Sequence, residues 1–282
     1  MDARVKPENQ ALASVDYLLH LADNALVLGQ RNAEWCGHAP ILEEDLAMAN
    51  QALDLIGQAR LLYQLAAARL NAEGRTRRPS AWPAGPVTED TLAYFRDDGD
   101  FRNYTLQELP HNPGLVPAAG GTRDWGVAIV RNFFYATLME MVWERLAQSP
   151  DPDLAAIAAK SLKEVRYHVR HARDWLLRLG DGTDESHRRV QAAVDYLLPF
   201  TAEFWTASAV DAQAVPAGVD VPALRAAWER AVDAALQEAT LARPPAVDAY
   251  VPQGKEGVHS EHLSYLLGEM QSLARAHPGA VW

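Results

Sequence analysis

The stretch DPDLAAIAAKSLKEVRYHVRHARDWLLRLG, residues 151–180, predicts one long helix with clear ends. Asp151 can cap the first turn, and Pro152 has a preset backbone angle and no amide hydrogen to leave unpaired. Gly180 stands where a left-handed residue can close the helix. Apolar and small residues recur every three or four positions, which predicts one buried face. That face comprises Leu154, Ala158, Ser161, Leu162, Val165, His168, Val169, Ala172, Leu176 and Leu179.

Two histidines of this helix, His168 and His171, raise the question of a metal site, with Glu164 one turn before the first. A carboxylate-bridged di-metal site in a helical bundle needs a Glu-x-x-His pair on each of two helices. The residue three before His168 is Val165, and the second helix contains no histidine. We therefore interpret His168 as a core histidine hydrogen-bonded to a facing helix. Glu164 and His171 are interpreted as residues at the bundle edge or at a subunit interface.

The composition and charge of the chain disfavour several classes of function. The chain has 282 residues, 49% of them hydrophobic, and a net charge of −11, which disfavours nucleic acid and anionic lipid as partners. The single cysteine excludes an internal disulfide and fits a reducing compartment. The sequence also lacks a signal-peptide pattern and an uncharged run of membrane-spanning length. We expect a soluble cytoplasmic protein.

Three more long helices are predicted, from near residue 12 to about 36, from 43 to 74 and from 124 to 148. The second begins with Glu43, Glu44 and Asp45, where the helix dipole favours negative charge. It is poor in charge and apolar on more than one side, as is typical of a helix buried from two directions or under a partner.

A long connection with one short helix near 89–96 separates the second and third helices. Two long helices, a long crossover and two long helices form the ferritin-like four-helix bundle. We therefore predict an all-α fold and a single domain over 1–282, with the core bundle at about 12–180. A C-terminal helical extension at about 184–282 would contain helices at 184–211, 222–241 and 260–277, with a loop at 213–222.

Other candidate chemistry is weak. Two loop segments match Glu-x-x-His, beginning at Glu108 and Glu256, and we interpret both as chance matches. Cys36 beside His38 could be a nucleophile, although a lone buried cysteine is the more common case. The basic loop 75–78, Lys255 and the helix start at Ser260 are weak hypotheses for phosphate contact, and the substrate-binding residues stay unknown.

The order of several motifs resembles the non-catalytic, ferritin-like component of the bacterial phenylacetyl-CoA epoxidase family, also called ring-1,2-phenylacetyl-CoA oxygenase. The matching segments are DNALVLGQRNAEWCGHAP at 23–40, LDLIGQAR at 53–60, EDTLAYFRD at 89–97, AAIAAKSLKEVRYHVRHARDWLLRLGDGTD at 155–184, GVHSEHLSYLLGEMQ at 257–271 and the final Trp282. The resemblance covers nearly the whole chain from about residue 15.

This resemblance implies a non-catalytic, ferritin-like structural subunit in phenylacetate catabolism. A homologous catalytic subunit would carry the di-iron centre, a reductase would carry FAD and an iron–sulfur cluster, and this chain would hold no cofactor. The resemblance places the former ligand positions at Ala25, Leu55, Gln58, Val165 and His168, of which only His168 keeps a ligand-type side chain. The equivalent position on the third long helix is not assigned.

Three functions follow as hypotheses. The first is a structural partner of the catalytic subunit, with assembly of this chain into a homo-oligomer as a further possibility. The second is a di-iron oxygenase that uses Glu164, His168 and His171 as non-standard ligands. The third is a metal-storage relative of ferritin. The missing ligands of the second helix argue against this hypothesis as they do against the di-iron oxygenase.

Overall fold

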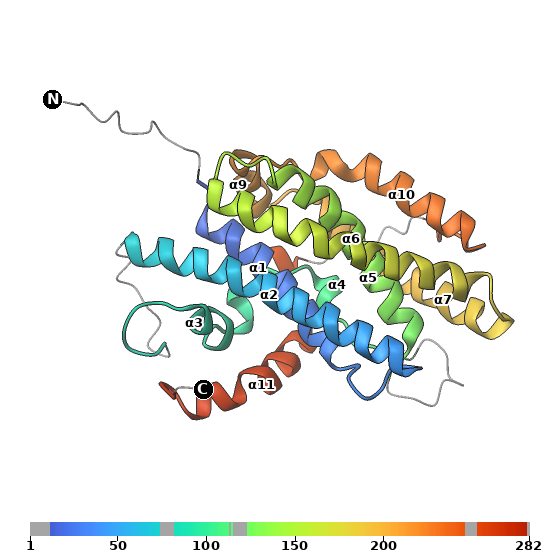
Figure 1. The fold of residues 1–282 in the computed structure, drawn as a ribbon, viewed down its shortest axis with the longest axis horizontal. Coiled ribbons are helices and arrows are strands. Elements are labelled where there is room, and N and C mark those ends of the chain that lie inside the picture. Colours follow the sequence, from blue (N-terminus) through green and yellow to red (C-terminus); the bar gives the residue numbers. More distant parts are fainter. Residues whose placement is uncertain (1–11, 74–81, 113, 115–122, 246–252, 281–282) are drawn as a thin grey trace.

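The computed structural model describes residues 12–73, 82–112, 114, 123–245 and 253–280. Its long helices are α1 (Val15–Ala33), α2 (Leu42–Ala72), α5 (Trp125–Leu146) and α6 (Pro152–Gly180). Figure 1 shows these four helices as the body of the molecule, with α1 against α2 and α5 against α6. The described residues form no strand, and the fold is the predicted all-α, ferritin-like arrangement.

Burial follows the sequence pattern. Helices α1 and α5 bury nearly all of their surface, since each packs against neighbours on several sides. Helix α6 buries one stripe, which contains Leu154, Ala158, Val165, Ala172 and Leu176 as predicted. Its first turn is capped as expected, because the Asp151 carboxylate accepts a hydrogen bond from the Leu154 amide at 3.3 Å.

Gly180 corrects one expectation. It is the last residue of α6 and does not have a positive φ angle. A Cβ added to it would lie 2.1 Å from the Ala239 carbonyl oxygen, which follows α10 (Arg225–Glu238). Glycine is therefore needed for close backbone packing and not for a left-handed cap.

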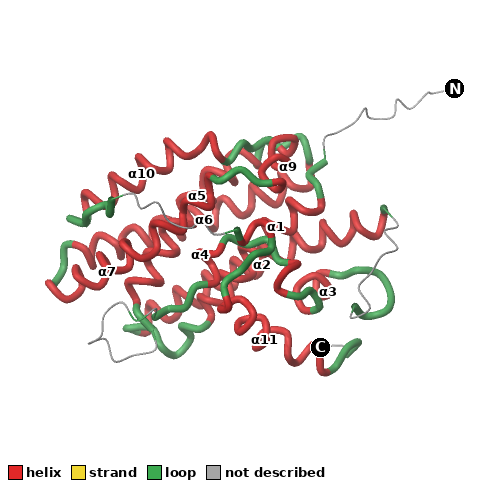
Figure 2. The backbone as a smooth tube through the Cα atoms, turned by 180° about the vertical axis from the view of Figure 1, so that it is seen from behind, coloured by secondary structure: helices red, strands yellow, loops and turns green. Residues whose placement is uncertain are grey.

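The crossover between α2 and α5 carries short helices, α3 (Glu89–Tyr94) and α4 (Thr105–Glu108), of which only the first was predicted. Figure 2 shows the crossover running along the opposite side of the bundle from the view of Figure 1. Part of it, the basic loop 75–78, lies outside the described residues.

The helix predicted over 184–211 is wrong as one element. The structure has α7 (Asp184–Leu197), a 3₁₀ turn (Leu198–Thr201), α8 (Ala202–Trp205) and α9 (Ala209–Ala217). Pro199 has no amide hydrogen with which to continue α7, and Ser208 caps a new helix by accepting from the Asp211 amide at 3.2 Å. The loop predicted at 213–222 is therefore helical as far as Ala217, and Gly218 ends it at φ 107°.

The last elements were placed correctly. Helix α10 follows a 3₁₀ turn at Pro222–Leu224, and α11 (Glu261–Ala276) covers the crossover next to α3. Across the described ranges, each helix is too short or too polar to cross a membrane.

Candidate functional site

The positions that the resemblance assigns to metal ligands are buried in the bundle. Ala25 lies on α1, Leu55 and Gln58 on α2, and Val165 and His168 on α6, each at most 3% exposed. Ala25, Leu55 and Val165 belong to the main apolar cluster of the protein. An alanine, a leucine and a valine offer no electron pair to a metal ion, so the interior at these positions is hydrocarbon.

His168 does face another helix, as the sequence predicted. Its Nε2 lies 3.0 Å from Asp54 Oδ2 on α2, and the imidazole donates this hydrogen bond because a carboxylate only accepts. Asp54 is 35% exposed at its side chain, whereas His168 is 4% exposed. The histidine thus connects the core of α6 to the outer edge of α2.

Glu164 and His171 also bind α2, each through different residues. Gln58 donates from its side-chain nitrogen to Glu164 Oε2 at 2.9 Å. His171 donates from Nε2 to Glu44 Oε2 at 2.7 Å, and its Nδ1 lies 3.0 Å from the side-chain nitrogen of Gln51. The prediction that both residues lie at a bundle edge agrees with this placement.

Together these contacts form a polar seam between the antiparallel helices α2 and α6. We define the α2–α6 seam by Glu44, Gln51, Asp54 and Gln58 on α2 and Glu164, His168 and His171 on α6. The contacts run in register, because a rising residue number on α2 meets a falling one on α6. These four contacts therefore set the register of α2 against α6, although the buried side-chain oxygen of Gln51 accepts no hydrogen bond.

This donor set does not fit a di-iron centre. A bridged centre requires carboxylates and imidazoles that converge from four helices on one point, and here they are distributed along one seam. Within the described parts of the chain, no group of three or more His, Cys, Asp or Glu side chains could hold a metal ion. Gln58, which the resemblance places at a ligand position, is an amide that donates to Glu164.

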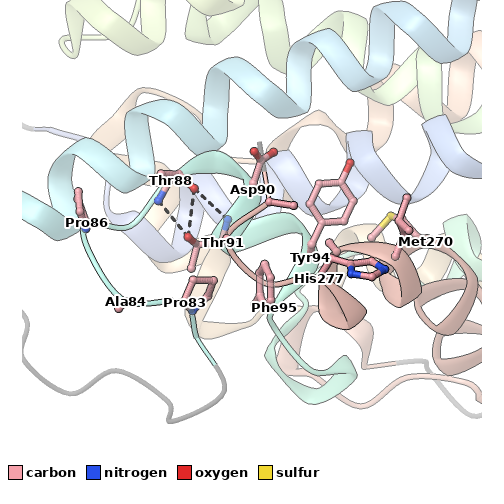
Figure 3. Close-up of a pocket in the computed structure, with 14 residues that line it drawn as sticks. Pro83, Ala84, Pro86, Thr88, Asp90, Thr91, Tyr94, Phe95, Met270 and His277 are labelled. Carbon is pink, nitrogen blue, oxygen red and sulfur yellow. Dashed lines mark hydrogen bonds between the residues drawn. The ribbon is translucent and has the colours of Figure 1, made fainter. Parts of the chain in front are cut away.

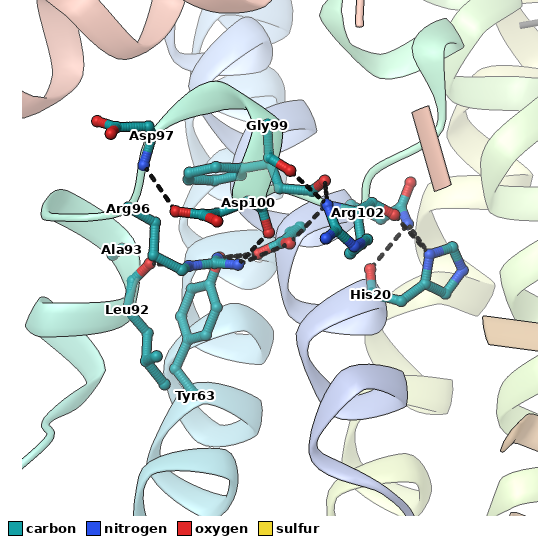
Figure 4. Close-up of polar contacts among 12 residues, drawn as sticks. His20, Tyr63, Leu92, Ala93, Arg96, Asp97, Gly99, Asp100 and Arg102 are labelled. Atoms are coloured by element: carbon teal, nitrogen blue, oxygen red, sulfur yellow. Dashed lines mark hydrogen bonds and ion pairs between the residues drawn. The ribbon is translucent and has the colours of Figure 1, made fainter. Parts of the chain in front are cut away.

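A second polar cluster, which the sequence reasoning missed, attaches the crossover to the bundle (Figure 4). Asp23 on α1 is fully buried and pairs with Arg96, which follows α3. Asp23 also accepts from the Tyr63 hydroxyl at 2.5 Å and from the Arg102 amide at 2.8 Å. Arg96 also donates to carbonyls, including that of Leu92 at 2.6 Å. The charged groups of this cluster are thus satisfied by other parts of the chain.

Next to it, His20 donates from Nδ1 to the Arg102 carbonyl at 2.6 Å. Burial lowers the pKa of His20 to about 4, with smaller opposing contributions from that carbonyl and nearby carboxylates. Figure 4 shows His20 and Arg96 on either side of the 97–102 segment. Both ends of this segment are therefore tied to α1.

The two Glu-x-x-His matches are combined in an unexpected way. Glu108 of the first match binds His259 of the second, with Oε2 2.8 Å from Nδ1. The same carboxylate accepts from the Ser260 amide at 2.6 Å, and His259 Nε2 donates to the Phe101 carbonyl at 3.0 Å. Burial lowers the pKa of His259, but the hydrogen bond and charge of Glu108 raise it by more, so the net pKa is above its usual value.

His111 and Glu256, the other members of the two matches, have separate roles. His111 donates from Nε2 to the Arg31 carbonyl at 2.7 Å, and Glu256 accepts from the Ala209 amide at 3.1 Å. Neither match forms a metal pair, so the residues serve to hold loops together.

Other candidates from the sequence are corrected. Lys255 is only 2% exposed and its Nζ lies 2.6 Å from Asp211 Oδ2, so it is not available to a phosphate. The amide of Ser260 is occupied by Glu108. Cys36 is exposed in the turn after α1, contrary to the buried cysteine that we expected.

A hollow of about 570 Å³ lies between α3 and α11 (Figure 3). Its lining includes Pro83, Tyr94, Met270 and Leu273. The hydroxyls of Thr88 and Thr91, which also line it, are engaged with each other at 3.1 Å as the cap of α3. The hollow is bounded by the crossover and α11, and its lining contains no residue of α1, α2 or α6.

Comparison with known proteins shows which family the chain belongs to. The family model described as "Phenylacetic acid catabolic protein" matches residues 1–282. The component designated C of the 1,2-phenylacetyl-CoA epoxidase of Escherichia coli strain K12 is 45% identical over 268 residues, which cover 94% of this chain and 98% of that protein. The chain therefore belongs to the phenylacetic acid catabolic protein family.

Proposed function

We propose that this chain is a non-catalytic structural subunit of a multicomponent phenylacetyl-CoA epoxidase in aerobic phenylacetate catabolism. It would pair with a di-iron catalytic subunit in the cytoplasm and support that subunit. In this proposal the di-iron centre belongs to the catalytic subunit, and FAD and an iron–sulfur cluster belong to a reductase. This chain would contribute a binding surface for the catalytic subunit and would hold no cofactor of its own.

The chemistry of the former ligand positions carries the proposal. Ala25, Leu55 and Val165 are buried apolar residues of the core, and Gln58 is a buried amide. The one retained ligand type, His168, is bonded to Asp54 across the α2–α6 seam. The chain is similar over nearly its full length to one component of an epoxidase, which supports a role for its helical bundle in binding the other components.

The test is to purify this chain and the catalytic subunit separately and together, and to count iron on each. We expect iron well below stoichiometric on this chain, and we expect the catalytic subunit to be less soluble, less stable or less active alone. Near-stoichiometric iron on this chain would instead favour the oxygenase hypothesis with Glu164, His168 and His171 as ligands, or a storage role. A catalytic subunit that is stable and fully active alone would refute the structural role.

A further inference from the structure

The surface of α2 carries an apolar stripe that no described part of the chain covers. Its leucines, Leu42, Leu46 and Leu53, have exposed fractions of 72%, 57% and 67%. Spacings of four and eleven residues place them within about 40° of one another around the helix at ~100° per residue. Exposed leucines that share one face of a long helix are typical of an interaction surface.

The stripe is also poor in charge. Between Asp45 and Arg60 the only charged residue of α2 is Asp54, which is bonded to His168 of α6. The glycine within this stretch, Gly57, has open space where a Cβ would stand. A solvated helix of this length ordinarily carries charges on its outer face. The lack of charge on this stretch of α2 therefore indicates that another molecule packs against it.

A hollow continues the stripe on the side of α3. It has a volume of about 280 Å³, and its lining combines apolar residues such as Leu26, Ile56 and Ala93 with the charged residues Arg60, Glu89 and Asp90. A volume of this size accommodates a large side chain from a neighbouring molecule. The surface thus offers a ridge of leucines together with a recess beside it.

The other flank, on α6, carries two lysines in a protein whose net charge is −11. Lys160 is 59% exposed at its side chain and lies 3.6 Å from the Glu164 carboxylate, and Lys163 follows it on the exposed side of α6. Tyr167 is 40% exposed and stacks on His171 of the seam at 6.0 Å between ring centroids. Figure 1 shows α2 and α6 side by side on the face toward the viewer.

We propose that this face, the α2 leucine stripe with the Lys160–Lys163 flank, is the docking surface for the catalytic subunit. The inference rests on the proposed function, because the related protein is one component of an enzyme. The partner surface would be a long helix with an apolar ridge that enters the recess near Ile56. Carboxylates beside that ridge would face Lys163 and Lys160, the exposed cations on this side of α6.

The experiment measures binding of the purified chain to the catalytic subunit by calorimetry, and complex size by light scattering. The stripe variant is L46E/L53E, and the matched control is V215E on α9, where Val215 is 56% exposed. We expect the stripe variant to lose about 100-fold or more in affinity. The control should bind like the unmodified chain. Circular dichroism and the Tm of each isolated variant should be unchanged, because these positions are exposed.

A second variant, K160E/K163E, should slow association by about 10-fold at low salt and weaken its salt dependence. If the unmodified chain binds but L46E/L53E binds equally well, this docking surface is wrong while the proposed function stands. The docking surface is equally wrong if L46E/L53E only converts a homodimer of this chain into monomers. If the unmodified chain does not bind the catalytic subunit at all, the proposed function itself fails.

Discussion

The buried Asp23–Arg96 ion pair connects the crossover to the bundle, and we expect its loss to lower the free energy of unfolding. Asp23 is fully buried and Arg96 is 3% exposed, and they come from α1 and from the segment after α3. The R96M substitution keeps a long apolar side chain and removes the charge. It leaves the Asp23 carboxylate with the Tyr63 hydroxyl and the Arg102 amide as its only donors among the contacts described above.

The magnitude follows from the unpaired carboxylate. Removing one partner of a buried ion pair costs about 3–5 kcal/mol, because the remaining charge stays desolvated. R96M should therefore lower the free energy of unfolding by about that amount. The double variant D23L/R96M leaves neither charge behind. Its loss should be smaller than the sum of the two single losses, by about 2 kcal/mol or more.

Urea denaturation followed by circular dichroism measures these free energies. The matched control is R60M, since Arg60 is 68% exposed and lies 3.4 Å from Glu89. An exposed pair of this kind contributes at most about 1 kcal/mol, so the control should be close to the unmodified protein. Hydrogen exchange should show faster exchange at 96–104 in R96M than elsewhere in the bundle.

Two results would refute this reasoning. If R96M is no more destabilised than R60M, the buried Asp23–Arg96 pair does not contribute significantly to the stability of the fold. If the losses of D23L and R96M are additive, the carboxylate and the guanidinium do not act as a unit.

Further predictions concern packing and pH. G180A should destabilise the protein by about 1–3 kcal/mol, because its Cβ would overlap the Ala239 carbonyl, whereas G268A, with open space on α11, should be neutral or stabilising by thermal unfolding. The raised pKa of His259 adds stability that is complete below about pH 6.5 and is lost as the pH rises through the folded-state pKa, so H259Q should flatten the alkaline part of a stability-versus-pH curve. The pKa of His20 is lowered to about 4, so its contribution has the opposite sign and declines as the pH falls from about 6.5 toward 4. H20Q should reduce this acid sensitivity, and an unchanged acid limb would contradict the assignment.

The sequence by itself determined the long helices, the Asp151 cap and the buried face of α6. Each of these depends on residues within four or so positions of one another, and such patterns are visible in one stretch of chain. The lack of a histidine on α2 could also be recognised without coordinates, because a ligand cannot be present if its residue type is missing. The motif order predicted the family to which the comparisons then showed that the chain belongs.

Only the tertiary structure decided which distant residues meet. Asp23 and Arg96 are 73 positions apart, and Glu108 and His259 are 151 apart, so nothing in their local sequence marks them as partners. The need for glycine at Gly180 likewise comes from the carbonyl of Ala239, whose approach is set by the packing of α10 on α6. The exposed side of α2 was also decided by tertiary structure. Periodicity shows that the helix is apolar, but only the packed bundle shows which of its leucines remain exposed.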